Sequence, residues 1–208
     1  MTLTKICGVT NIDDALAAVD LGADYIGFVF AESPRRVDTR TAGEVIRALG
    51  GRVKTVGVFV DESDDVLRMM DECGFDYAQL HGNQSEDFAG KIGGERVIRV
   101  ARVSDESSVD VLPTYTEAAY YLLDTYKKGQ AGGTGEVFNW TLAVRAKSLG
   151  KPVFLSGGLT PQNIIDAINT VKPYAVDISS GVEMCPGKKD HHKIKELIDN
   201  VRAADIAS

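Results

Sequence analysis

Residues 153–181 read VFLSGGLTPQNIIDAINTVKPYAVDISSG, and they show most clearly the unit from which the fold is built. A short apolar run ends at Ser156, a glycine pair follows, and apolar residues then recur at helical spacing at Ile164, Ile165, Ile168 and Val171. A second apolar run covers 175–179 and also ends on small polar residues. The pattern predicts two parallel strands joined by a crossover helix.

The same unit repeats along the whole chain. Eight apolar, β-branched runs alternate with helical patterns, and their last residues are about 25 positions apart, close to the ~30 of a βαβ unit. The expected strands are 4–7, 25–30, 53–60, 77–81, 97–103, 119–124, 153–156 and 175–179. Eight such units without a linker predict an α/β fold, a (β/α)₈ TIM barrel forming a single domain over 1–208. The alternative is a doubly wound open sheet.

Local signals place the ends of the helices. Glycines stand where helices should stop, at Gly22, Gly50, Gly74 and Gly150. Asn83 with Glu86 predicts a capping box, and Thr160 followed by Pro161 predicts a cap with proline at the first helical position. The fifth unit is the weakest, because Pro113 interrupts its helical pattern.

Composition narrows the class of protein. The 208 residues carry 23 Lys and Arg against 30 Asp and Glu, a net charge of −7, and 44% are hydrophobic, which excludes disordered, collagenous and coiled-coil chains. No run reaches the ~18 apolar residues of a membrane helix, and the first residues lack a signal peptide. The three cysteines fit neither a disulfide framework nor a zinc motif. We expect a cytoplasmic protein that binds neither nucleic acid nor membrane.

Polar residues cluster where the expected strands end, which is where barrel enzymes build their active sites. Gly157 and Gly158 follow the seventh strand, and Ser180 and Gly181 follow the eighth. Either pair alone is typical of a tight turn, but both together predict a phosphate site made by backbone amides. The mouth should then be locally positive, with the negative charge on the outer helices.

Two titratable groups stand at strand ends. Cys7 could be a small buried hydrophobe, or a base if a neighbouring cation lowers its pKa. Asp124 could cap a turn, or act as a general acid beneath the glycine-rich segment TYKKGQAGGTGE, a candidate lid. Alternation places Lys5 on the face of Cys7, and closure of the barrel predicts that Lys5 pairs with Asp177.

Two further positions could bind an anion. Ser33-Pro34-Arg35-Arg36 is either a solvated basic loop or a rigid turn that offers a guanidinium to a carboxylate. His81 could titrate, or simply hydrogen-bond to backbone. Cys73 and Cys185 are expected to be buried or surface cysteines without a role.

The ordered set of motifs resembles the phosphoribosylanthranilate isomerase family. It comprises KICGVT, GFVF followed by SPR, VGVFV, QLHG, LLD with GGTGEVFNW, LSGGL and VDISSGVEMCPGKKD, and it covers nearly the full chain. The resemblance implies an isomerase of tryptophan biosynthesis, which converts N-(5-phosphoribosyl)anthranilate to 1-(2-carboxyphenylamino)-1-deoxyribulose 5-phosphate by an Amadori rearrangement, without cofactor or metal. The sequence leaves open whether the protein is a monomer or a homodimer.

The same resemblance implies roles for particular residues. Cys7 matches the base that removes the C2 proton of the ribose, and Asp124 matches the acid that protonates the ring oxygen. Arg35 matches the arginine that holds the anthranilate carboxylate, with the adjacent Arg36 as the alternative. The glycines Gly157, Gly158 and Gly181 match the phosphate loops.

Rival interpretations are another phosphosugar barrel, such as the bifunctional isomerase of histidine and tryptophan synthesis or a ribulose-phosphate epimerase, and a non-catalytic phosphoribosyl-binding barrel. The bifunctional isomerase has an aspartate in place of Cys7, and the epimerase needs metal-binding histidines. A binding barrel would be expected to have lost the acid or the base, yet Cys7 and Asp124 are both present.

Overall fold

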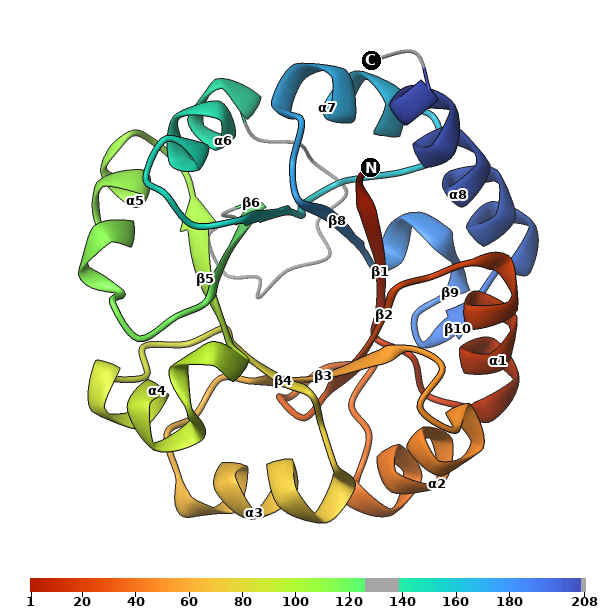
Figure 1. Cartoon of the computed structure of the whole chain (residues 1–208). Helices are drawn as coiled ribbons and strands as arrows, with labels where there is room; N and C mark the ends of the chain where they lie inside the picture. Colours follow the sequence, from red (N-terminus) through yellow and green to blue (C-terminus); the bar gives the residue numbers. More distant parts are fainter. Residues whose placement is uncertain (126–138, 207–208) are drawn as a thin grey trace.

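Eight parallel strands form a closed barrel in the order of the sequence, and β8 is hydrogen-bonded to β1 (Figure 1). This computed structural model describes residues 1–125 and 139–206. The strands are β1 (Leu3–Cys7), β2 (Tyr25–Val29), β3 (Lys54–Phe59), β4 (Tyr77–Leu80), β5 (Val97–Val103), β6 (Tyr120–Thr125), β7 (Val153–Leu155) and β8 (Ala175–Ile178). The predicted (β/α)₈ barrel is confirmed. The open doubly wound sheet is wrong, because it would leave its first and last strands unpaired with each other.

The helices of the described residues form a ring around the barrel (Figure 1). They are α1 (Ile12–Leu21), α2 (Thr39–Leu49), α3 (Asp64–Cys73), α4 (Glu86–Ile92), α5 (Ser107–Asp110), α6 (Trp140–Lys147), α7 (Ile164–Val171) and α8 (His191–Ile206). Short 3₁₀ turns are η1 (Gly94–Arg96), η2 (Leu112–Thr114) and η3 (Ser180–Val182). After η3 a small antiparallel hairpin, β9 (Glu183–Cys185) and β10 (Lys188–Lys189), precedes α8.

The predicted strand ends agree with the observed ones to within one residue. Three predicted helix stops are also confirmed, because Gly22, Gly50 and Gly74 adopt the left-handed conformation directly after α1, α2 and α3. The fourth is wrong. Ser148 caps α6, and Gly150 turns the chain two residues later with φ of 90°.

Both predicted helix starts are wrong. Helix α4 is capped by Ser85, whose Oγ accepts the Phe88 N–H, and not by Asn83. Helix α7 begins at Ile164 rather than at Pro161, because Asn163 Oδ1 accepts the Thr160 N–H and holds the intervening residues in a turn. In the fifth unit only four residues form α5, and η2, which contains Pro113, follows.

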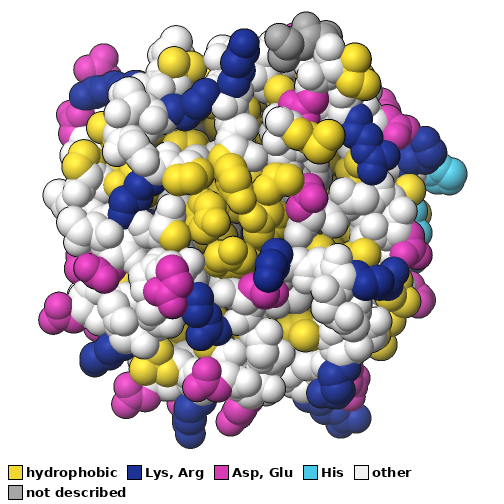
Figure 2. Space-filling view, viewed as in Figure 1, with side chains coloured by type: hydrophobic (Ala, Val, Ile, Leu, Met, Phe, Trp, Pro, Cys, Tyr) yellow, Lys and Arg dark blue, Asp and Glu magenta, His cyan; other side chains and the backbone are white. Residues whose placement is uncertain are grey.

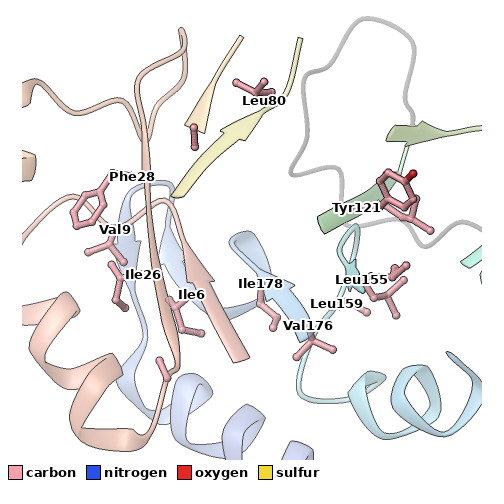
Figure 3. Close-up of a cluster of buried hydrophobic side chains, with 14 of the residues drawn as sticks. Ile6, Val9, Ile26, Phe28, Leu80, Tyr121, Leu155, Leu159, Val176 and Ile178 are labelled. Carbon is pink, nitrogen blue, oxygen red and sulfur yellow. The ribbon is translucent and has the colours of Figure 1, made fainter. Parts of the chain in front are cut away.

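Alternate strand residues face outward and pack against the helices. Ile6, Ile26, Phe28, Val176 and Ile178 are buried in this layer, between the strands and the surrounding helices (Figure 3). The strands read as nearly continuous apolar runs because both of their faces are covered.

The inward-facing residues differ from one end of the barrel to the other. Where the strands begin, Tyr25, Phe154, Tyr120 and Tyr174 pack edge-to-face or tilted, with ring centroids 5.3–5.6 Å apart around Phe154. Hydrophobic side chains accordingly gather at the centre of this face (Figure 2). We call this aromatic cluster the floor of the barrel, and it closes that end.

No helix within the described residues is both long and apolar enough to cross a membrane.

Candidate active site

A pocket opens at the carboxyl ends of the strands. Each strand, or the residue directly after it, contributes to the lining: Cys7, Val29, Val58, Gln79, Arg102, Asp124, Ser156 and Asp177. The residues Arg35, His81, Gly157, Gly158, Ser180 and Gly181 line it too. The structure therefore brings all eight residues singled out from the sequence into one pocket.

Cys7 ends β1 and is 7% exposed. Its neighbour in register is Gly27, where a Cβ would lie 2.8 Å from Cys7 Sγ and 3.0 Å from Lys5 Nζ, so only glycine leaves room for both groups. Burial raises the pKa of the Cys7 thiol, although the charge and hydrogen bond of Lys5 oppose the rise. A neighbouring cation therefore acts on the thiol in the direction that a base at this position requires, but desolvation has the larger effect.

The predicted pair of Lys5 and Asp177 is confirmed. The two residues are neighbours in register on β1 and β8, and Lys5 Nζ lies 2.8 Å from Asp177 Oδ1. Burial alone would lower the pKa of Lys5, but attraction and hydrogen bonds to Asp177 and Cys7 together outweigh it and raise the pKa. The side chain of Lys5 is fully buried and remains an ammonium one layer below Cys7.

Asp124 projects into the pocket from β6 and is 6% exposed. Its Oδ1 accepts the Thr125 N–H at 2.9 Å, and its Oδ2 lies 3.4 Å from His81 Nε2. His81 Nδ1 lies 3.3 Å from Gln79 Nε2, whereas His81 Nε2 has no hydrogen-bond partner among the described residues. The ring of His81 therefore contacts side chains and not the backbone.

The glycines after β7 and β8 allow close backbone packing. Gly157 and Gly158 have positive φ, and a Cβ at Gly157 would lie 2.2 Å from Thr125 Oγ1. A Cβ at Gly181 would lie 2.0 Å from the Leu159 carbonyl oxygen. The amides of Gly157 and Gly158 donate to no acceptor within residues 1–125 and 139–206. They remain available to an anion in the pocket.

The turn before α2 separates the two neighbouring arginines. Arg35 lines the pocket, whereas Arg36 is exposed and only its backbone pairs with Val29. Arg35 Nε and Nη2 donate to the two carboxylate oxygens of Glu183 at 2.8 and 2.7 Å. Glycine is needed at position 8 for this arrangement, since a Cβ on Gly8 would lie 2.6 Å from Arg35 Cδ.

Four residues of the site were missed at the level of sequence. Glu183 and Lys189 belong to the motif after β8, but nothing in their spacing indicates that the hairpin folds back to Arg35. Arg102 and Gln79 could have been found by alternation, because each lies on the inward face near the end of its strand. Arg102 Nη2 donates to the His81 carbonyl oxygen at 3.1 Å.

The expected positive mouth stays a prediction, because the segment after Thr125 lies outside the described residues. Among the described side chains, Lys5 is paired with Asp177, and Arg35 and Lys189 both contact Glu183. Buried cations have carboxylate partners here because an unpaired buried charge is costly. The free backbone amides of Gly157 and Gly158 add positive groups to the pocket.

The candidate lid after Asp124 lies outside the described residues, which resume at Asn139. Of the other cysteines, Cys73 is buried and Cys185 is exposed, and neither lines the pocket.

Comparison with known proteins gives one consistent result. Residues 4–200 match the family model described as N-(5'phosphoribosyl)anthranilate (PRA) isomerase. The chain is 48% identical over 200 residues to the N-(5'-phosphoribosyl)anthranilate isomerase of Geobacter sp. (strain M21), covering 95% of this chain and 97% of the relative.

Solved structures agree. The crystal structure of phosphoribosyl anthranilate isomerase from Thermotoga maritima has a TM-score of 0.91 and 39% identity, over 98% of this chain and 100% of that one. A similar enzyme, solved in complex with reduced 1-(o-carboxyphenylamino)-1-deoxyribulose 5-phosphate, has a TM-score of 0.87 and 38% identity over the same shares.

Proposed function

The chain belongs to the N-(5'-phosphoribosyl)anthranilate isomerase family, and from that premise we propose which side chains carry out its reaction. The protein is an isomerase of tryptophan biosynthesis. It converts N-(5-phosphoribosyl)anthranilate to 1-(2-carboxyphenylamino)-1-deoxyribulose 5-phosphate. The observation that carries the assignment of roles is that Cys7 and Asp124, from strands that are not neighbours, line the same pocket as both glycine pairs.

Asp124 is the general acid. It donates a proton to the ring oxygen of the ribose, the bond from C1 to that oxygen breaks, and the nitrogen lone pair forms a C1=N iminium. Two contacts orient the carboxyl group in the pocket. The Thr125 N–H donates to Oδ1, and His81 Nε2 lies 3.4 Å from Oδ2.

Cys7 is the general base. The iminium withdraws electrons from C2, so the thiolate removes the C2 proton while a C1=C2 double bond forms and the nitrogen regains its lone pair. Protonation at C1 and loss of the C2 hydroxyl proton then give the ketone. The Lys5 ammonium supports this role, because its charge favours the thiolate in a site where burial disfavours it.

The two ends of the substrate bind at different loops of the mouth. The phosphate is held by the backbone of Gly157, Gly158, Ser180 and Gly181, whose tight packing leaves no room for a Cβ at Gly157 or Gly181. The anthranilate carboxylate is held by Arg35. The exposure of Arg36 and its position outside the pocket favour Arg35 over it.

We infer that the enzyme works in the cytoplasm, which the free cysteines support, and needs no cofactor or metal. Whether it is a monomer or a homodimer stays a prediction that sedimentation of the purified protein would decide.

The experiment is a turnover assay with phosphoribosylanthranilate generated in situ, whose fluorescence falls as it is consumed. Arg35→Ala should raise KM by roughly 10- to 100-fold, since a charge-assisted hydrogen bond is lost, whereas Arg36→Ala should leave KM unchanged. An unchanged KM in Arg35→Ala would transfer the role to Arg36. A wild-type protein that leaves the fluorescence constant would favour the non-catalytic barrel.

A further inference from the structure

A buried lysine outside the assigned machinery contacts three parts of the site at once. Lys189, on β10, is 2% exposed. Its Nζ donates to the Cys7 carbonyl oxygen at 2.6 Å, to the Ser179 carbonyl oxygen at 3.2 Å and to Glu183 Oε1 at 2.9 Å. One ammonium therefore joins the end of β1, the loop after β8 and the carboxylate that holds Arg35.

The geometry around Arg35 divides its guanidinium into two edges. The Nε–Nη2 edge is occupied by Glu183, in a bidentate pair. The edge that carries Nη1 has no protein acceptor among the described residues, and Arg35 lines the pocket. Glu183 fixes the plane of the guanidinium and leaves the second edge for an anion.

The charges explain why a second cation is needed. Arg35 and Glu183 alone form a neutral pair, and the Glu183 carboxylate would repel a substrate carboxylate bound next to it. Lys189 compensates Glu183 and returns the cluster to one net positive charge. A buried ammonium is costly: burial lowers the pKa of Lys189, and the charge and hydrogen bond of Glu183 oppose that shift.

The backbone of Lys189 is anchored from the outer side of the barrel. Its N–H donates to Asp14 Oδ2 at 2.9 Å, and Asp14 Oδ1 lies 2.7 Å from His191 Nε2. The hairpin of β9 and β10 is therefore fixed at both of its buried charged residues, Glu183 and Lys189.

We propose that Glu183 and Lys189 form a positioning pair that orients Arg35 and, through the charge of Lys189, gives the site its preference for a substrate carrying a carboxylate. The inference rests on the proposed role of Arg35. It adds that, while Glu183 occupies one edge of Arg35, the net positive charge that selects the carboxylate depends on Lys189.

The test measures binding of two probes to the purified enzyme by calorimetry. One probe is reduced 1-(2-carboxyphenylamino)-1-deoxyribulose 5-phosphate, and the other is its counterpart without the carboxyl group. Lys189→Met should weaken binding of the first by about 10- to 100-fold and of the second by about 3-fold or less, because only the first depends on the charge. The matched control is Lys188→Met, an exposed neighbour on the same strand, which should change neither affinity.

A double variant separates charge from packing. Glu183→Gln with Lys189→Met removes both charges and leaves Arg35 as the single cation, so it should bind the carboxylated probe about 10-fold more tightly than Lys189→Met alone. If Lys189→Met does not fold, the double variant is compared with the wild type and should keep its preference for the carboxylated probe.

Three results would overturn the inference: equal losses for both probes in Lys189→Met, no recovery in the double variant relative to Lys189→Met, or a folded double variant with no preference. Arg35→Ala distinguishes this failure from a failure of the proposed function. If Arg35→Ala loses only the carboxylated probe while Lys189→Met loses neither, Arg35 keeps its role and the pair has none. If Arg35→Ala does not discriminate between the probes, the carboxylate role of Arg35 itself is wrong.

Discussion

The two ends of the barrel interior are built from the same strands and have opposite chemistry. On β6, Tyr120 belongs to the floor and Asp124 to the pocket, and on β8 the fully buried Ala175 precedes Asp177 by two residues. The floor contains tyrosines and a phenylalanine in edge-to-face contact. The pocket contains an ion pair, a thiol and a carboxylate, all buried.

The difference shows that this barrel places its aromatic packing and its reactive groups at opposite ends. Apolar packing at the floor stabilises the fold without burying charged groups. The pocket end holds buried polar atoms without a hydrogen-bond partner among the described residues, at Gln79 Oε1 and His81 Nε2. Such groups cost free energy in the unliganded protein, which is expected of a site organised for a ligand.

The largest expected effect tests the pocket end. Cys7→Ala and Asp124→Asn should each lower kcat by about 10²- to 10⁴-fold, because a proton transfer loses its base or its acid. Binding of the reduced analogue and the free energy of unfolding should change little. Steady-state kinetics and urea unfolding measure both, with the exposed Cys185→Ala as the control. Turnover near the wild-type rate in either variant would remove that residue from the mechanism.

The next effect tests the floor. Phe154 is fully buried between Tyr25, Tyr120 and Tyr174, and Phe154→Ala should lower the free energy of unfolding by about 3–5 kcal/mol through lost burial and a cavity. The kcat of the folded variant should remain within about 3-fold of the wild type, because a site on well-packed strands tolerates a distant cavity. A loss of kcat as large as that of Cys7→Ala would break the division between the two ends.

A smaller effect tests how finely the pocket end is fitted. In Gly27→Ala the new methyl group would displace Cys7 Sγ and Lys5 Nζ, and we expect kcat to fall by roughly 10- to 100-fold, because the base is misplaced. Gly90→Ala is the matched control, since the nearest atom to its Cβ is 3.9 Å away. Equal kinetics for the two variants would mean that β2 shifts freely and that the glycine is not required.

The smallest effect concerns the outer anchor of the pocket end. Burial would raise the pKa of Asp14, but hydrogen bonds from the Lys189 N–H, Asn11 and His191 hold it below its ordinary value. Because the pKa of Asp14 is lower in the folded protein, its carboxylate stabilises the fold fully at pH values above the unfolded pKa of about 4. This contribution to stability is lost as the pH falls through the folded pKa. Thermal unfolding from pH 6 to pH 2.5 should therefore show a gentler acid decline for Asp14→Asn than for the wild type. The control variant, Asp13→Asn at an exposed position, should follow the wild-type curve. If Asp14→Asn also followed the wild-type curve, the hydrogen bonds of Asp14 would contribute nothing to the stability of the fold in acid.

Much of the fold could be predicted from the sequence because it depends on local periodicity. Apolar runs fix the strands, left-handed glycines end α1, α2 and α3, and alternation with barrel closure is enough to pair Lys5 with Asp177. The two predicted helix starts are wrong because Ser85 and Asn163, which form the caps and turns, compete with equally plausible neighbours.

The order of strands and helices, the barrel and eight residues at its mouth therefore follow from the chain alone, since patterns along the sequence indicate them. Contacts across the fold were needed to establish that Arg35 and not Arg36 faces the pocket, and that Glu183 and Lys189 stand behind it. Charge compensation in a buried site depends on which side chains meet in three dimensions, and spacing along the chain does not record that. Arg35 and Glu183, for example, are 148 positions apart in sequence and meet only when the barrel closes.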